Sequence, residues 1–358
     1  MDQSARRMGL TIYDIAREAG VSIATVSRVF NNSPRVAPHT RKRVLEVARR
    51  LGYQPHVSAQ SLARRQAQTV AAIVPMLTNY FFVEVLRGLQ DRLAETNFDL
   101  LVYAAPTLSD VDAHLERALQ RGRSAGVMIF STPMSPERVE RLQRSRQPVV
   151  LVDSFHPDFD SVSIDNEQGG YLAARHLLEH GYRRIGLLMA HPDSVPARER
   201  RHGYERALRE AGLEPDPDLI VASTDPHNHG YTEEGGYEAM KQLLERTPRP
   251  EAVFVVSDIM ALGALRAVEE AGLRVPDDLG LIGFDDLRVS RFLGLSTLRQ
   301  PMYEMGKLAA EKLLRRIAEL ELPVTSTVFA PRLICRRTCA PGARDGQPET
   351  AALSQNQT

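Results

Sequence analysis

The chain has 358 residues and equal numbers of basic and acidic residues, 45 of each, so its formal net charge is zero. At roughly 100–200 residues per domain, this length predicts two or three domains. A composition of 43% apolar and 25% charged residues is typical of a folded globular protein. It excludes a disordered, collagen-like or disulfide-scaffold chain.

The zero net charge is the sum of two unlike parts. Residues 1–65 contain twelve basic and four acidic residues, a formal charge of +8, which leaves −8 on the rest of the chain. A basic segment attached to an acidic body indicates a nucleic-acid-binding module joined to a second, different domain.

The two cysteines, Cys335 and Cys339, are too few for a disulfide framework and have no zinc-ligand pattern around them. The chain starts without a secretory signal pattern, and no apolar run approaches the roughly 18 residues of a membrane span. We therefore expect a cytoplasmic protein with free thiols, no membrane contact and no cofactor.

Three short helices are predicted in the basic segment. Thr11 is a candidate N-cap for the first helix, with Asp14 in the capping-box position, and Gly20 is placed to end it. The second helix is predicted over residues 23–30 with Ser22 as its cap. The third is predicted from Pro38 to about Gly52. Two helices joined by a tight turn, the second short and serine-capped, form a helix-turn-helix, although any small three-helix bundle shows similar caps.

The residues decide between these alternatives. The string TIYDIAREAGVSIATVSRVFNN, followed by RVAPHTRKRVLEVARRLGYQP, closely resembles the DNA-binding headpiece of the lactose/galactose repressor (LacI) family without a gap over about 45 residues. The resemblance implies a dimer that binds double-stranded, palindromic operator DNA and places the second helix in the major groove.

Arg28 can then donate two hydrogen bonds to a guanine, whereas Ile23 and Ala24 offer only apolar contact to bases. The resemblance implies phosphate contacts for a set of polar positions, each of which has a cap or a satisfied hydroxyl as its alternative role. They are Thr11, Ser22, Thr25, Ser27, Asn31 and Thr40.

Residues 56–68 resemble the hinge helix and linker of the family. A helix this short is marginal in water, so we expect it to order when two copies meet on DNA. The resemblance places Leu62 as a wedge that kinks the duplex through the minor groove and Ala59 against the groove floor. Packing of Leu62 on the body is the alternative.

From residue 69 the pattern changes to alternating strands and helices, with strands expected at 70–74, 100–103, 127–130, 149–152, 185–189, 253–256 and 281–284. This predicts an α/β body of two doubly wound parallel-sheet lobes, and the run resembles the periplasmic-binding-protein-like effector domain of the family. The expected domains are thus an all-α helix-turn-helix headpiece (1–55), the hinge (56–68), a two-lobed effector-binding and dimerisation domain (69–340) and a disordered tail (341–358).

The sequence contains no nucleotide-binding loop, nucleophile elbow or zinc motif, so we predict no enzymatic activity, no catalytic residue and no metal site. His176 and His180 are spaced as two metal ligands would be, but a solvated helix face explains them better. His191, His227 and His229 lie in loops that could edge a pocket.

Open α/β sheets bind ligands just beyond the ends of their strands. Several polar and aromatic residues lie there, and the resemblance implies that they contact a small-molecule effector, best a sugar, with nucleobases and small acids as alternatives. They are Phe81, Phe82, Asp153, Arg200, Tyr231, Ser257 and Asp285. Core packing is the alternative role for Phe81 and Phe82. Helix capping is the alternative for Asp258 and for Asp285 or Asp286.

The sequence therefore predicts a ligand-responsive transcriptional regulator of the LacI type, a repressor in its simplest form. Two other functions would explain parts of the chain: an enzyme with a DNA-binding head, or a solute-binding protein without a regulatory role. The identity of the effector and the direction of its effect on DNA binding are left open.

Overall fold

The computed structural model describes residues 10–30, 33–53 and 67–339 of the chain. The headpiece and most of the body form two separate compact units. Asn31, Ala59 and Leu62, nearly all of the expected hinge and the whole expected tail lie outside the described residues. Across the described part of the chain, we find no helix with the length and apolar character needed to cross a bilayer.

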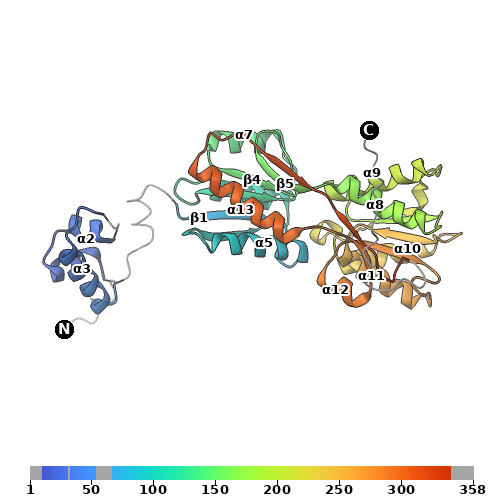
Figure 1. Cartoon of the computed structure of the whole chain (residues 1–358), viewed down its shortest axis with the longest axis horizontal. Helices are drawn as coiled ribbons and strands as arrows, with labels where there is room; N and C mark the ends of the chain where they lie inside the picture. Colours follow the sequence, from blue (N-terminus) through green and yellow to red (C-terminus); the bar gives the residue numbers. More distant parts are fainter. Residues whose placement is uncertain (1–9, 31–32, 54–66, 340–358) are drawn as a thin grey trace, which may run out of the picture. The chain divides into compact units, whose positions relative to one another are not determined.

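The headpiece contains the three predicted helices, α1 (Ile12–Ala19), α2 (Ile23–Phe30) and α3 (Pro38–Leu51) (Figure 1). Gly20 and Gly52 end α1 and α3 in the left-handed conformation, with φ of +61° and +68°, which a glycine adopts without steric cost. The apolar stripes of the three helices meet in one small core of Ile15, Ala16, Ala19, Val26, Val29, Val44, Val47 and Ala48.

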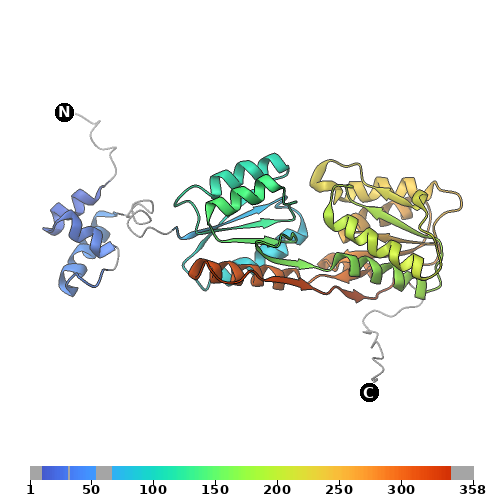
Figure 2. The same ribbon diagram turned by 90° about the horizontal axis from the view of Figure 1, so that it is seen from above.

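The body contains two six-stranded sheets, each the centre of one lobe (Figure 2). The first lobe begins with β1 (Thr69–Val74), α5 (Tyr80–Leu93), β2 (Asp99–Ala104), α6 (Leu108–Ala118), β3 (Gly126–Phe130), α7 (Pro136–Ser145), β4 (Val149–Val152) and β5 (Asp160–Ile164). Its strand order is β11-β5-β4-β3-β1-β2.

The second lobe has the strand order β12-β10-β9-β8-β6-β7. Its main run is α8 (Asn166–Glu179), β6 (Ile185–Met189), α9 (Val195–Glu210), β7 (Ile220–Ala222), α10 (Glu233–Leu244), β8 (Ala252–Val255), α11 (Asp258–Glu270), β9 (Gly280–Asp285), α12 (Arg288–Leu293) and β10 (Ser296–Arg299).

The chain crosses between the lobes three times. After β5 it enters the second lobe, after β10 it returns for α13 (Met302–Ala318) and β11 (Ser326–Phe329), and it ends in the second sheet with β12 (Arg332–Ile334). Figure 1 shows α13 beside α5, and both helices pack on one core of the first lobe. The lobes are therefore joined by three segments.

The central strands are buried on both faces, which explains their continuous apolar sequences. In β1, Val70, Ala72 and Val74 face the core beneath α5 and α13, while Ala71 and Ile73 face the core beneath α6 and α7. The strands from β11 through β5, β4 and β3 to β1 run parallel, as do those from β10 through β9, β8 and β6 to β7, whereas β12 pairs antiparallel with β10. The predicted fold class, a helical headpiece and a body of two doubly wound lobes, is confirmed.

The seven predicted strands correspond to β1, β2, β3, β4, β6, β8 and β9. The sequence pattern did not indicate β5, β7, β10, β11 or β12. Several of these missed strands carry serine, threonine and arginine. Ser296 and Thr297 of β10 are nevertheless fully buried.

Candidate DNA-binding surface and ligand cavity

The N-terminus of α2 presents apolar side chains to solvent. Ile23 is 41% exposed and Ala24 is also exposed, and Arg28 is exposed just over one turn further along the helix. The opposite face of α2 carries Val26 and Val29, which are buried in the headpiece core. The helix thus turns to solvent the three residues predicted to face the bases, and their contact with DNA stays a prediction.

The described residues predicted to contact phosphates lie in or next to the helices of the headpiece, and several have local partners. The Asp14 carboxylate accepts from the Thr11 backbone N–H at 3.0 Å and from its hydroxyl at 2.7 Å. The Ser22 hydroxyl accepts from the Thr25 N–H at 3.1 Å and lies 2.9 Å from the Thr25 hydroxyl. The predicted capping roles of Thr11 and Ser22 are therefore present, which leaves their phosphate contacts as predictions, with those of Thr25, Ser27 and Thr40.

A cavity of about 960 Å³ lies between the two lobes of the body, beyond the carboxyl ends of both sheets. All seven residues predicted from the sequence as effector contacts line it: Phe81, Phe82, Asp153, Arg200, Tyr231, Ser257 and Asp285. The first three come from the first lobe and the other four from the second. The structure therefore brings the predicted set together, and ligand contact by its members stays a prediction.

Arg200 is held rigidly in the wall of this cavity. It is 4% exposed, its Nε donates to Asn166 Oδ1 at 2.9 Å and its Nη1 donates to the Val256 carbonyl at 2.5 Å. The guanidinium carbon lies 3.6 Å from the centroid of the Phe284 ring, a cation–π contact. Its neighbours Arg198 and Arg201 are exposed or half-buried, as expected for at least one arginine of this run.

Close packing of α8 against α9 sets the position of Arg200. A Cβ atom on Gly170 would lie 1.9 Å from the Arg200 carbonyl oxygen, and one on Gly203 would lie 1.8 Å from the Glu167 carbonyl oxygen. Only glycine permits this approach of the two backbones. The sequence around the site is thus constrained by backbone packing as well as by the chemistry of its side chains.

Two carboxylates from opposite lobes face Arg200. Burial raises the pKa of Asp153 to about 6, although the Ser131 hydroxyl, which donates to it at 2.6 Å, and Arg200 both lower it. Burial also raises the pKa of Asp285, opposed by Arg200 and by Gln300 Nε2, which donates to it at 2.6 Å. Both aspartates have positive φ, +52° and +123°, so the backbone turns sharply where each side chain enters the cavity.

The remaining predicted contacts are built into the wall. The Tyr231 hydroxyl bonds to the Ser194 hydroxyl at 2.8 Å, and burial raises the pKa of Tyr231 to about 12. Ser257 caps α11 by accepting from the Met260 N–H. Phe81 and Phe82 contact each other edge to face and belong to the core of the first lobe. Ser257 thus caps a helix and the two phenylalanines belong to the core, while all three also line the cavity.

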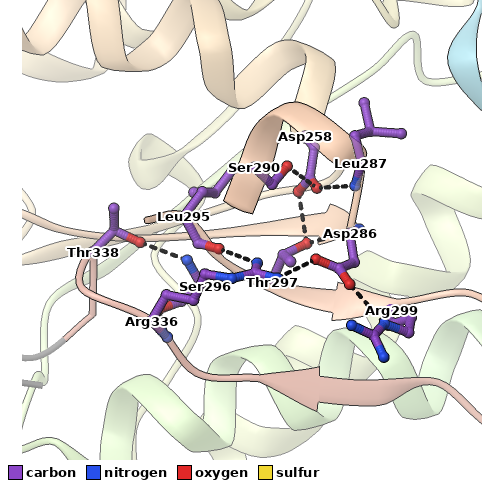
Figure 3. Close-up of polar contacts among 10 residues, drawn as sticks. All are labelled: Asp258, Asp286, Leu287, Ser290, Leu295, Ser296, Thr297, Arg299, Arg336 and Thr338. Carbon is purple, nitrogen blue, oxygen red and sulfur yellow. Dashed lines mark hydrogen bonds and ion pairs between the residues drawn. The ribbon is translucent and has the colours of Figure 1, made fainter. Parts of the chain in front are cut away.

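The neighbouring acids Asp258 and Asp286 have structural partners (Figure 3). Asp258, at the first position of α11, accepts from the Thr297 and Ser290 hydroxyls and from the Leu287 N–H, at 2.6, 2.5 and 2.9 Å. Asp258 therefore does not cap α11. Its hydrogen bonds connect the start of α11 to the segment around α12 and to β10. Asp286 forms ion pairs with Arg299 and Arg336 and caps no helix. The capping interpretation was wrong for Asp286, and Asp285 is not the N-cap of α12 either.

The histidine predictions need one correction. His180 is exposed, but His176 is only 2% exposed, and burial lowers its pKa to about 4. A solvated face was therefore wrong for His176, because that side of α8 packs on α9 and the sheet. His191 and His229 line the cavity, whereas His227 pairs with Asp225 outside it. Within the described residues, no cluster of three or more histidine, cysteine or acidic side chains is arranged to hold a metal ion.

Two polar residues of the cavity were missed by sequence analysis. Asn166 binds Arg200 and follows β5, and Gln300 binds Asp285 and follows β10. Both lie where the chain crosses between the lobes. The rule that ligands lie beyond strand ends would have found them if β5 and β10 had been recognised as strands.

Models of two known families match the chain. Residues 11–56 match the bacterial regulatory proteins of the lacI family, and residues 174–339 match the periplasmic binding protein-like domain. The chain is 37% identical over 332 residues to catabolite control protein A of Priestia megaterium, covering 91% of this chain and 98% of that protein. It is 33% identical to the HTH-type transcriptional repressor PurR of Aliivibrio salmonicida, covering 92% and 98%.

The chain is also similar to solved structures of transcriptional regulators. The Lac repressor dimer bound to operator and the anti-inducer ONPF has a TM-score of 0.80 and 26% identity, covering 93% of this chain and all of that one. The cellobiose complex of the transcriptional regulator CelR has a TM-score of 0.69 and 30% identity, covering 92% and 100%.

A helix-turn-helix followed by a two-lobed, periplasmic-binding-protein-like body defines a DNA-binding transcriptional regulator. The two relatives are more than 30% identical to this chain and are matched over nearly their whole length. The chain therefore belongs to the LacI family of bacterial regulatory proteins.

Proposed function

We propose that the protein is a cytoplasmic, non-catalytic regulator, a repressor in its simplest form, that binds a palindromic operator as a homodimer and changes its operator affinity when a sugar-like effector occupies the interlobe cavity. The observation that carries this proposal is the convergence of Arg200, Asp153 and Asp285 from separate strand ends on one cavity, in a chain that also presents an exposed recognition helix. The relatives named above are repressors and a catabolite control protein.

In the headpiece, Arg28 would donate to guanine, while Ile23 and Ala24 would pack against thymine methyl groups or base edges. Leu62 and Ala59 of the hinge would enter the minor groove between two half-sites. The domain boundaries proposed from the sequence, 1–55, 56–68, 69–340 and 341–358, assign these two DNA contacts to separate segments.

The cavity would couple to DNA through the crossings between the lobes. Two cavity residues that would grip the effector are bonded to residues at crossings: Arg200 to Asn166 at 2.9 Å, and Asp285 to Gln300 at 2.6 Å. An effector that forms hydrogen bonds with Arg200 and Asp285 would change these contacts and so favour one arrangement of the lobes. A difference of about 1–3 kcal/mol between arrangements changes operator affinity about 5–150-fold.

Two steps test this function. Selection of DNA from a random pool by the full-length protein should enrich a palindrome. The affinity for that DNA, measured by fluorescence titration, should then change when a ligand identified by thermal unfolding is added. Enrichment of no sequence would refute operator recognition. A ligand that stabilises the protein without changing operator affinity would favour the solute-binding alternative.

A further inference from the structure

The cavity wall is strongly acidic. Among the described residues that line it, Arg200 is the one lysine or arginine, whereas six carboxylates belong to the same lining: Asp153, Asp165, Glu167, Asp193, Glu199 and Asp285. A concave, low-dielectric surface lined by one sign of charge concentrates counter-ions and repels ions of its own sign. The body as a whole is also acidic, so nothing in its net charge opposes this local field.

The charges near these carboxylates do not add up to neutrality. Asp153 and Asp285 share the single charge of Arg200. Glu167 is paired with Arg206. Asp153, Asp165 and Glu199 accept instead from neutral donors, which are the Ser131 hydroxyl, the Gln168 N–H and the Asn166 amide. A neutral donor stabilises a carboxylate without cancelling its charge at a distance, so the negative potential of the cavity survives these hydrogen bonds.

Arg200 cannot neutralise this wall. Its charge is already shared between Asp153 and Asp285, whose pKa values it lowers against the effect of burial. Its Nε and Nη1 are bound to Asn166 and to the Val256 carbonyl. The guanidinium keeps N–H groups that can donate to a ligand, but its single positive charge does not balance the six carboxylates of the lining.

The hydrogen-bonding capacity of the wall points the same way. Gln300 is 4% exposed, its Nε2 donates to Asp285, and its Oε1 is buried without a hydrogen-bond partner among the described residues. A buried acceptor without a donor is unfavourable. Together with the carboxylate oxygens, it gives the wall acceptors that the hydroxyl or ammonium hydrogens of a ligand can satisfy.

We propose that the effector cavity selects a ligand that donates hydrogen bonds and carries no negative charge, that is, a polyhydroxy compound with or without an ammonium group, and excludes phosphorylated sugars and sugar acids. A phosphate or carboxylate oxygen accepts hydrogen bonds only and would meet like charges. The proposal rests on the function proposed above, since it concerns the ligand of the same cavity.

The sign of the potential can be measured without knowing the ligand. A Val195→Cys variant places a thiol at 37% exposure on α9, four residues before Glu199 and two after Asp193. Val83→Cys, 43% exposed on α5 and outside the cavity lining, is the matched control. Both are made in the full-length protein with Cys335→Ser. Cys339 is buried and can stay.

Each thiol is reacted at pH 8 with a trimethylammonium-ethyl and a sulfonatoethyl methanethiosulfonate. We expect the ratio of cationic to anionic rates at residue 195 to exceed that at residue 83 by about tenfold or more at low salt. Addition of Asp193→Asn and Glu199→Gln should bring the ratio down toward that of the control. Equal ratios at the two sites would overturn the proposal.

The second arm uses ligands. Thermal unfolding is measured with matched panels of neutral sugars, amino sugars, sugar phosphates and sugar acids, and stabilisation should come only from the first two classes. A phosphorylated or carboxylated sugar that stabilises the protein more than its uncharged parent would overturn the proposal even if the rate ratios agree. A ligand of the expected class that leaves operator affinity unchanged would instead contradict the proposed regulatory function.

Discussion

The guanidinium of Arg200 is stacked on Phe284, the residue immediately before Asp285, with 3.6 Å between the guanidinium carbon and the ring centroid. One short segment of β9 therefore supplies both the aromatic face that orients the arginine and a carboxylate that balances its charge. Asn166 and the Val256 carbonyl fix two of its nitrogens. The cation is pre-positioned at the junction of the lobes before any ligand arrives.

We expect Arg200→Ala to lower the free energy of unfolding by about 2–4 kcal/mol at pH 8, because two buried acceptors and two facing carboxylates lose their partner. The loss should be smaller at pH 5, where Asp153 and Asp285 can take up protons. Urea unfolding at the two pH values measures both. Arg198→Ala, an exposed neighbour, should change stability by less than about 0.5 kcal/mol. An equal loss for Arg200→Ala at both pH values would contradict the electrostatic account.

Asp153 is expected to destabilise the fold at neutral pH. Burial raises its pKa to about 6 from the ordinary 3.8, so its contribution is fully present below pH 3.8 and is lost as the pH rises through 6. Asp153→Asn should thus add about 1–2 kcal/mol to the free energy of unfolding at pH 7.5 and little at pH 4. Asparagine also tolerates the residue's φ of +52°.

The control for Asp153→Asn is Asp193→Asn in the same cavity. The Asp193 side chain is 86% exposed, so this substitution should leave the free energy of unfolding nearly unchanged. Chemical unfolding between pH 4 and 8 gives both curves. A variant that is less stable than the unmodified protein at pH 7.5 would show that the charged form of Asp153 is favoured by the fold.

Buried His176 should make the protein sensitive to mild acid. Its pKa is lowered by burial to about 4, and among the described residues neither ring nitrogen has a hydrogen-bond partner. The unfolded chain takes up a proton at about pH 6.5, so the stability due to this group falls as the pH drops toward 4, by about 2 kcal/mol at pH 5. His176→Leu should remove this part of the pH dependence. His180→Gln, on the exposed side of α8, should keep it.

The sequence predicted the headpiece and the apolar strands well because their periodicity is local. It missed β5 and β10 because Asp160, Ser161, Ser296 and Thr297 are polar yet buried. Their burial is possible only through distant partners, such as Arg316 for Asp160 and Asp258 for Thr297. A one-dimensional pattern cannot show such pairings.

Some residues of the candidate site could be selected from the sequence and others could not. Asp153, Arg200 and Asp285 could be selected because they adjoin strands or a helix that the pattern revealed. Asn166 and Gln300 could not, since each becomes a cavity residue only where the chain crosses between lobes. The burial of His176 also depends on helix packing that its spacing from His180 does not reveal.

Leu62, outside the described residues, carries a prediction from the sequence alone. If it wedges into the duplex, Leu62→Ala should weaken binding to the selected operator far more than binding to random DNA, because unstacking matters only in the specific complex. Both affinities should fall steeply with salt, since each depends on phosphate contacts. Equal losses on both DNAs in fluorescence titrations would rule out the wedge.

Helix packing behind Arg200 gives a last prediction. A methyl group on Gly203 would lie 1.8 Å from the Glu167 carbonyl and 2.5 Å from the Tyr171 nitrogen. Both contacts are backbone atoms that cannot rotate away, so Gly203→Ala must push α9 from α8 and stretch the bond from Arg200 to Asn166.

We expect Gly203→Ala to cost about 3 kcal/mol of stability, at the upper end of overpacking effects, and to lower the ligand-induced thermal shift as well. Gly186→Ala is the comparison, since its methyl group would meet the end of the Leu243 side chain at 2.8 Å, which can turn aside. It should cost less and leave the thermal shift unchanged. If the two variants lose the same stability and the same ligand shift, backbone contact between α8 and α9 does not position Arg200.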